Sequence, residues 1–322
     1  MEEFESPPYK VYSSAHTRLN NYIKISIVAV EYLFKAKPND KELSELINEL
    51  IRDSGERWTP RIFNDPKKEL TELKNDLVKT GIIWVYSAFD VFFKKMEGSL
   101  SGFFKDQTEI DIASVVVEEA DEDEPDEEEK KETKIIALYK KLGWPLDDIQ
   151  DLLPILKFYE LLRHCVAHRS GYPSEKLVKV SNSHEFKNAI ANWRTKFAGK
   201  NISPPPVVSM EKIELKGHHA ILYSETCLRI AKDMNHRYSK LIDVNYLIGR
   251  IIKRYLIDTK ELHRPFGEDF SRYIVYHLKN DYNILVTPYK NIYDYYGENE
   301  ETRKEHNNRY THLKRESSKK NI

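Results

Sequence analysis

Apolar residues recur every three to four positions along most of the chain, which is the spacing of one face of an α-helix. The pattern predicts helices over about residues 13–36, 40–52, 67–104, 134–142, 146–168, 185–197 and 216–242. The remaining stretch, 244–322, is rich in tyrosine and charge and predicts two or three short helices with a frayed polar tail. Only 11 glycines occur and charged residues make up 32% of the chain, so the sequence favours an all-α fold.

Local start and stop signals support these helices. Ser13 and Ser14 precede apolar periodicity and are suitable N-cap residues for the first helix. Pro154 is expected either to open the main part of the 146–168 helix or to kink it, and Gly171 and Pro173 are expected to end it. Consecutive prolines make residues 202–208 an extended connector, and residues 285–288 are expected to be a short extended element.

The charge is distributed unevenly along the chain. The whole sequence has a formal net charge of −1, with 51 basic and 52 acidic residues. Residues 118–132 alone hold eleven acidic residues and two lysines, so the rest of the chain carries a net charge of +8. The acidic run lies in a predicted insert, about 106–133, that cannot bury a core and lacks the glycine and ligand spacing of an EF-hand loop. We interpret it as a solvated linker rather than a metal site; the basic remainder suits a polyanionic partner.

Several protein classes are excluded by simple features. No apolar run approaches the ~18–20 residues of a membrane span, and the acidic N-terminus lacks the apolar region of a secretory signal. The two cysteines, Cys165 and Cys227, lie within apolar helical patterns and are expected to pack as small hydrophobic residues. Neither a disulfide framework nor a cysteine-based zinc site can be built from them. The sequence therefore predicts a soluble cytoplasmic protein without membrane contact.

Residues 159–171, Tyr-Glu-Leu-Leu-Arg-His-Cys-Val-Ala-His-Arg-Ser-Gly, carry the candidate chemistry. On a helix with ~100° per residue, one face is apolar. Its members are Ile155, Phe158, Leu162, Cys165 and Val166. The opposite arc gathers Arg163, Glu160, His164 and His168 at roughly 0°, 60°, 100° and 140°. Two imidazoles and a guanidinium on one arc can serve as a general acid–base and anion-binding set.

The positions of His168 and Arg163 add two expectations. His168 lies in the last helical turn, where the carbonyl end favours a protonated imidazole by typically 0.3 to about 1 kcal/mol. Arg163 and His168 are ~140° apart, so one copy of the helix hardly encloses a phosphate. A second copy that lays the same face against the first would bring two arginines and two histidines into one cleft. The helix geometry therefore favours a site shared between two subunits.

The segment Arg163-His164-Cys165-Val166-Ala167-His168 resembles the signature of the HEPN superfamily, in which a polar residue follows an arginine and a histidine comes four to six positions after it. The apolar helix before it and the glycine-containing turn after it agree with the family. Residues 84–93 resemble the first HEPN helix and place its acidic position at Asp90. Residues 207–242 resemble the closing helix. The likeness implies a HEPN-like helical bundle over 66–243, with an N-terminal helical extension, 1–60, and a C-terminal one, 244–322.

HEPN proteins are commonly homodimers that meet through the motif helices, and many are metal-independent endoribonucleases of toxin or antiphage defence systems. The resemblance therefore implies RNA as substrate, no cofactor or metal, and a 2′,3′-cyclic phosphate product. Arg163 would neutralise the transition state, His168 would move the proton, and His164 would orient the phosphate or the partner motif. Glu160 and Asp90 are expected to support the site. Arg169, directly after the motif, is expected to bind RNA.

Glu160 and the two motif histidines also allow interpretations without catalysis. Glu160 can form an ordinary surface pair with Arg163 or His164, worth ~0.2–0.5 kcal/mol. His164 and His168 have the spacing of a helical zinc pair, but the sequence holds no HExxH motif and offers no obvious third ligand, although His218 and His219 occur on a later helix.

Three more alternatives concern the C-terminal region and the function of the protein. The tyrosines of 244–322 can form a core or interface rather than stack on RNA. The protein can be a non-catalytic adaptor that binds a nucleotidyltransferase antitoxin or a defence effector. A nucleotide sensor is a further alternative, although the sequence holds no glycine-rich phosphate loop of the Walker or Rossmann type.

Overall fold

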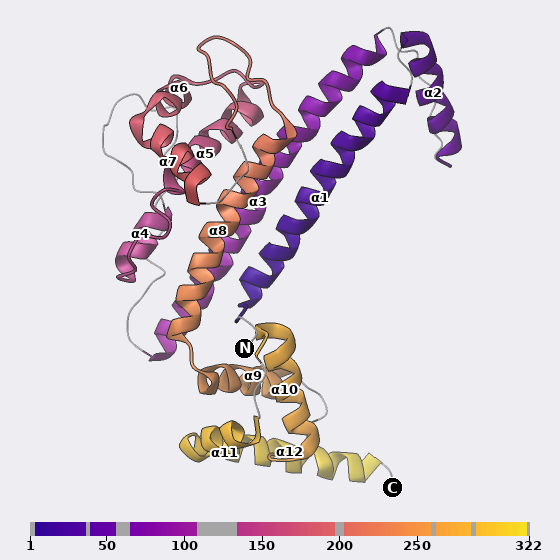
Figure 1. The fold of residues 1–322 in the computed structure, drawn as a ribbon. Coiled ribbons are helices and arrows are strands. Elements are labelled where there is room, and N and C mark those ends of the chain that lie inside the picture. The colour runs from indigo at the N-terminus through magenta and orange to yellow at the C-terminus, as the bar shows by residue number, and fades with distance from the viewer. Residues whose placement is uncertain are drawn as a thin grey trace. The chain divides into compact units, whose positions relative to one another are not determined.

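Every regular element in the described part of the chain is a helix. The computed structural model describes residues 4–36, 39–55, 65–107, 134–196, 203–258, 262–284 and 288–320. Helices α1 to α12 follow one another through these ranges without a β-strand among them (Figure 1). The all-α class predicted from the sequence is therefore confirmed. None of the described helices combines the length and apolar character that crossing a membrane requires.

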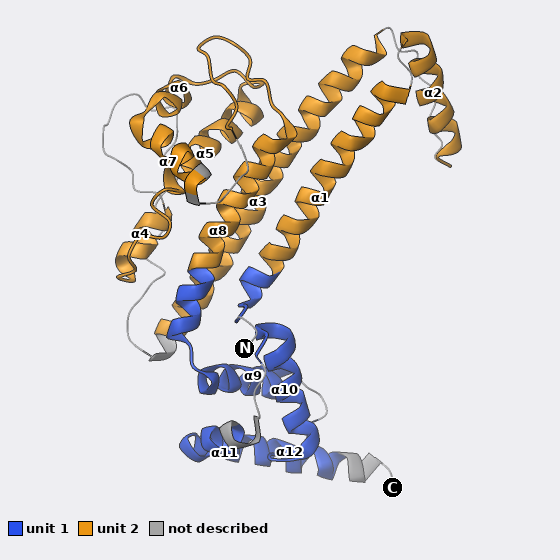
Figure 2. Ribbon diagram, viewed as in Figure 1, with its two compact units in different colours: residues 1–10, 234–322 blue, residues 11–233 orange. Residues whose placement is uncertain are grey.

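The chain forms two compact units (Figure 2). Unit 2 consists of Val11–Asp233, and unit 1 combines Met1–Lys10 with Met234–Ile322. Helices α1 and α8 each contribute residues to both units, so the boundaries between the units do not coincide with breaks in a helix.

Two of the first three helices are long. The three are α1 (Pro7–Ala36), α2 (Asp40–Asp53) and α3 (Pro66–Gln107). The predicted start of α1 at Ser13 and Ser14 is wrong. The helix begins at Pro7, and the carbonyl of Ser6 accepts a hydrogen bond from the Lys10 N–H at 2.9 Å. Proline suits the first helical position because it has no N–H to leave unpaired there.

In unit 2, α1 approaches α3 and α8 (Gly217–Leu241) closely. Gly217 leaves room for Ile27, because a Cβ atom on that glycine would lie 2.2 Å from the Ile27 Cδ1 atom. Gly81 of α3 has the same role for Ile23, whose Cδ1 atom would lie 2.9 Å from an added Cβ. Ile23 is 1% exposed, so these contacts belong to the core. Glycine therefore sets the distance between the three longest helices of the unit.

Four shorter helices complete unit 2. They are α4 (Lys134–Lys141), α5 (Leu153–His168), α6 (Glu175–Asn182) and α7 (His184–Lys196). Helix α5 packs against α3, α6 and α7. The sequence pattern did not predict α6, since it is short and rich in β-branched residues. Its start is fixed instead by Ser174, whose side chain accepts a hydrogen bond from the Leu177 N–H at 3.2 Å.

The described part of unit 1 contains four helices beyond the end of α8. They are α9 (Val244–Asp258), α10 (Glu268–Tyr282), α11 (Pro288–Glu298) and α12 (Glu300–Lys320). The prediction of two or three helices with a frayed tail was wrong. Helix α12 has little apolar periodicity, so the sequence pattern did not reveal it, and a buried polar residue holds it in place. His306 is 0% exposed, and its Nδ1 atom lies 2.6 Å from the Tyr296 hydroxyl.

The tyrosines of unit 1 divide between core and surface. Tyr282, Tyr295 and Tyr296 are buried in the unit's core, whereas Tyr276 and Tyr293 are 61% and 56% exposed. The core interpretation therefore holds for the first three.

Some predictions fall on other parts of the chain. Most of the acidic insert, 108–133, lies outside the described residues, as do 202 and 285–287. Residues 203–208 have no helical structure, as the prolines predict.

Candidate functional site

The candidate motif lies on the second half of α5. Pro154 stands in the first turn of this helix and opens it. The helix ends at His168, and the N–H groups of Arg169 and Gly171 both donate to the Cys165 carbonyl at 3.0 Å. Gly171 has a φ of +88°, a left-handed conformation that glycine adopts without strain. Proline and glycine thus fix both ends of the motif helix, as the sequence predicts.

The apolar face of α5 is buried as predicted. The five residues of the predicted stripe are all between 0% and 8% exposed, and these are Ile155, Phe158, Leu162, Cys165 and Val166. Phe158 stacks on Phe186 of α7 with ring centroids 4.5 Å apart. Tyr159 stacks on Tyr223 of α8 at 4.8 Å. Burial of this face fixes the rotation of α5, which in turn directs the motif arc.

Arg163 lies over an aromatic ring of α3. Its Cζ atom is 4.0 Å from the centroid of the Tyr86 ring, which is a close cation–π contact. Its Nε atom is buried and has no hydrogen-bond partner. Among the residues that the structure describes, no carboxylate forms an ion pair with Arg163. The guanidinium is therefore held in place by Tyr86 without being neutralised.

Arg229 of α8 is an instructive contrast. It also lies over an aromatic ring, with its Cζ atom 5.3 Å from the centroid of Trp193. Unlike Arg163, it forms an ion pair with Glu225 at 2.7 Å. The comparison shows that a carboxylate pairs with one ring-stacked arginine, whereas none of the described carboxylates pairs with the arginine of the motif.

The two motif histidines lie next to each other at the surface. The His164 and His168 rings have centroids 4.8 Å apart. His168 and Arg169 are exposed, whereas His164 is half-buried. An exposed imidazole in the last helical turn can exchange protons with a bound ligand or with solvent. The structure therefore leaves the His168 side chain accessible from solvent at the end of α5.

The two carboxylates predicted to support the site differ in their surroundings. Glu160 faces α8. Burial is the main reason why the pKa values of Tyr223 and Cys227 on that helix are raised, and the negative charge of Glu160 raises both further. Asp90 of α3 forms an ion pair with Lys94 at 2.8 Å, one helical turn beyond Tyr86. Glu160 thus lies beside the buried centre of unit 2, and Asp90 is engaged on its own helix.

A neighbouring loop adds a residue that the sequence did not single out. The backbone N–H of Ile213 donates to the Gly171 carbonyl at 2.9 Å, so the loop before α8 is tied to the turn after the motif. The Lys212 side chain runs along this turn: its Cγ and Cε atoms would each lie 3.7 Å from a Cβ on Gly171. Residues 171 and 212 are far apart in sequence, and no periodicity connects them. Only the folded chain reveals Lys212.

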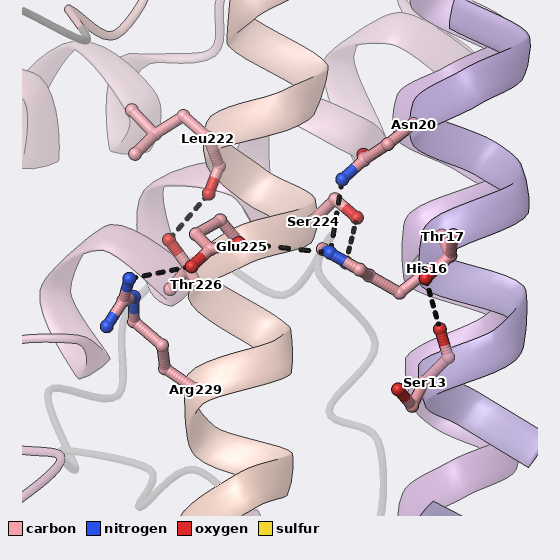
Figure 3. A network of polar contacts seen from close by, with 9 residues as sticks. All are labelled: Ser13, His16, Thr17, Asn20, Leu222, Ser224, Glu225, Thr226 and Arg229. Atoms are coloured by element: carbon pink, nitrogen blue, oxygen red, sulfur yellow. Dashed lines mark hydrogen bonds and ion pairs between the residues drawn. The ribbon is translucent and has the colours of Figure 1, made fainter. Parts of the chain in front are cut away.

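A second polar cluster joins α1 to α8 (Figure 3). The His16 Nδ1 atom lies 2.7 Å from the Ser224 hydroxyl, and its Nε2 atom lies 3.1 Å from the Asn20 side-chain nitrogen and 3.8 Å from Glu225. Serine, histidine and glutamate are the residue types of a hydrolytic triad. Ser224, however, is 1% exposed and no substrate reaches its hydroxyl, so the cluster is a buried link between two helices.

Metal ligands do not gather in the described part of the chain, where no group of three or more His, Cys, Asp or Glu residues has a geometry that suits a metal ion. His219 is engaged otherwise, since its Nδ1 atom accepts a hydrogen bond from the Lys216 N–H at 2.9 Å. Burial lowers the pKa of His219 to about 3. The zinc interpretation therefore obtains no third ligand from His219.

No family model, curated protein or solved structure matches the chain.

Proposed function

We propose that this protein is a metal-independent endoribonuclease of the HEPN kind, with Arg163 and His168 as its catalytic residues. The observation that carries the proposal is the state of Arg163, which is held 4.0 Å from the Tyr86 ring while no described carboxylate pairs with it. A guanidinium that is positioned but not neutralised suits a ligand phosphate, which it can bind through two parallel hydrogen bonds. The exposed His168 lies at the end of the same helix.

The proposed reaction needs a proton acceptor, a proton donor and a group that binds the anion. The ribose 2′-oxygen attacks the adjacent phosphorus, a new P–O bond forms, and the bond from phosphorus to the 5′-oxygen breaks. One imidazole accepts the 2′-hydroxyl proton, and the leaving 5′-oxygen receives a proton from the second one. Arg163 neutralises the extra negative charge of the transition state. The products are a 2′,3′-cyclic phosphate and a 5′-hydroxyl.

Two imidazoles on opposite sides of the phosphate require two copies of the chain. Arg163 and His168 are ~140° apart around an ideal helix, so one copy presents them in diverging directions. A homodimer that pairs the exposed arc of α5 with its symmetry mate brings both sets together. In this dimer His164 orients the phosphate or the partner's motif, and Glu160 and Asp90 hold the helices that carry the site.

The cellular setting is also a proposal. An RNA-cleaving protein of this kind acts in the cytoplasm and serves defence or toxicity, where a partner protein that covers the motif arc would hold it inactive. The two free cysteines, Cys165 and Cys227, are buried, which is in keeping with a reducing compartment.

The test compares purified wild type with Arg163→Ala and His168→Ala on tRNA and mRNA. We expect each substitution to lower the cleavage rate by about 10²–10³ or more, the loss typical of one positioned charge donor. Two variants serve as matched controls: Arg229→Ala removes a ring-stacked arginine that has a carboxylate partner, and His184→Ala removes an exposed histidine of the same unit. Both should keep wild-type activity.

The dimer should persist in both motif variants, as measured by light scattering. Cleavage that continues in Arg163→Ala and His168→Ala would contradict the proposal. So would wild-type protein that leaves every RNA intact and instead co-purifies with a partner, the behaviour of an adaptor.

A further inference from the structure

The loop before α8 is pinned against the protein directly after Lys212. Ile213 and Leu215 are 3% and 7% exposed, and the Ile213 N–H donates to the Gly171 carbonyl. The Lys212 side chain, by contrast, is exposed and lies along the turn that directly follows the motif. A lysine whose backbone is anchored on one side while its ammonium group faces solvent is well placed to bind a charged ligand.

Lys212 differs from the other lysine of this loop. Lys216 has an acidic neighbour, because its Nζ atom lies 3.8 Å from Glu214. Lys212 and the nearby Arg169 form no ion pair with any residue in the described ranges. Together with Arg163, these residues bring to α5 and the turn after it three cations that pair with none of the described carboxylates. Like charges at close range repel one another, and a bound polyanion would relieve this repulsion.

Apolar side chains are exposed at the same place. Tyr172, directly after Gly171, is 48% exposed, and Val208 and Met210 of the loop are 52% and 88% exposed. Met210 also has a φ of +67°, a left-handed conformation that methionine rarely adopts. An exposed aromatic ring among unpaired cations is the combination with which proteins bind single-stranded nucleic acid, since the ring stacks on a base and the cations contact phosphates.

We infer that Lys212 and Tyr172 form an RNA subsite beside the motif, in which Lys212 binds a phosphate next to the scissile one and Tyr172 stacks on an adjacent base. The inference rests on the proposed ribonuclease function, because it names how the same site holds its substrate. It adds a chemical preference: the substrate has an unpaired base at this position, so single-stranded loops are bound and continuous duplex is not. Arg169 lies between the subsite and His168 and contributes a further phosphate contact.

The test measures binding rather than cleavage. The full-length protein is titrated into a fluorescent single-stranded 2′-O-methyl RNA, which has no free 2′-hydroxyl and cannot be cleaved, and anisotropy is recorded at several salt concentrations. Removing one phosphate contact lowers the slope of log affinity against log salt by about 0.7 for a single strand. We therefore expect Lys212→Ala to weaken binding several-fold and to reduce the slope by about that amount. The matched control Lys216→Ala should keep the slope of the wild type.

Loss of the Tyr172 ring should also weaken binding, but without the change in salt dependence expected for Lys212→Ala. Loss of one stacked base costs about 1–3 kcal/mol, so Tyr172→Ala should weaken binding by about five-fold or more at every salt concentration without changing the slope. Tyr172→Phe keeps the ring and should bind like wild type. Both residues are exposed, and thermal unfolding checks that each variant folds.

Equal slopes for Lys212→Ala and Lys216→Ala would overturn the subsite, and so would the absence of any RNA binding by the wild type. These outcomes are distinct from failure of the ribonuclease proposal. If RNA binds as expected but is cleaved equally by wild type and the Arg163 variant, the proposed chemistry fails and the binding surface stands.

Discussion

The contact between Tyr86 and Arg163 offers a quantitative test of how the candidate site is positioned. The Arg163 Cζ atom is 4.0 Å from the ring centroid, well within the ~6 Å range of cation–π attraction. The buried Nε atom shows that the guanidinium is partly removed from water. Cation–π pairs contribute about 0.5–1 kcal/mol when exposed and about 2 kcal/mol when desolvated, so we expect about 1–2 kcal/mol here.

The perturbation is Tyr86→Leu, which removes the ring and keeps an apolar side chain. In a double-mutant cycle with Arg163→Gln, urea unfolding should give a coupling free energy of about 1–2 kcal/mol. If the ring also holds the guanidinium in its catalytic position, Tyr86→Leu should slow RNA cleavage by about five- to thirty-fold, since 1.36 kcal/mol corresponds to a factor of ten in rate. Tyr86→Phe is the control, because it keeps the ring and should keep most of the activity.

The two readouts separate positioning from folding. A coupling free energy below about 0.3 kcal/mol is no larger than the deviation between independent sites, and it would refute the cation–π contribution. Equal cleavage rates for Tyr86→Leu and Tyr86→Phe would refute the positioning role even if the coupling in stability is present.

Three further predictions concern stability and reactivity. Gly171→Ala should destabilise the protein by about 1–2 kcal/mol in urea unfolding because of its φ of +88°, whereas Gly98→Ala inside α3, where an added Cβ meets nothing within 4 Å, should stabilise it by about 0.5–1 kcal/mol; the opposite order would contradict the assigned backbone conformation. Burial lowers the pKa of His219 from 6.5 to about 3, so the unfolded chain binds the proton first as the pH falls. Its contribution to stability is complete above pH 6.5 and is lost between pH 6.5 and 3 at about 1 kcal/mol per pH unit, and His219→Gln should make stability at pH 7.5 and 5.0 more nearly equal than in the wild type. Cys165 and Cys227 are both 0% exposed, so Ellman's reagent should label them at the rate of unfolding, and immediate labelling of the native protein would show that the core is more open than described.

Local patterns were sufficient to predict the part of α5 that carries the motif, although the helix begins at Leu153 and not near residue 146. The stripe that includes Leu162 and Cys165 is buried, Pro154 opens the helix and Gly171 ends it, because each of these effects depends on residues within a few positions of one another. Where two local signals compete, the sequence misled: serines at 13 and 14 resemble caps, but Pro7 begins the helix earlier.

The contacts that give the site its chemistry are not local. Tyr86 is far from Arg163 in sequence, and the position of its ring depends on how α3 packs against α5. Lys212 lies beside the turn after the motif because the Ile213 N–H donates a hydrogen bond to the Gly171 carbonyl. His16 and Ser224 form a buried link that no spacing connects. Tertiary packing, rather than propensity or periodicity, decides all three.

The most direct test of the central claim is the chemistry of the RNA ends. A single-stranded RNA is incubated with wild-type protein in EDTA, alongside an identical strand that carries one 2′-deoxy residue at the mapped cleavage position. The arrangement of Arg163 and His168 predicts 2′,3′-cyclic phosphate and 5′-hydroxyl ends in EDTA, and no cleavage at the 2′-deoxy position. Cleavage that stops with the chelator, or that continues at the 2′-deoxy residue, would contradict a metal-independent attack by the ribose hydroxyl.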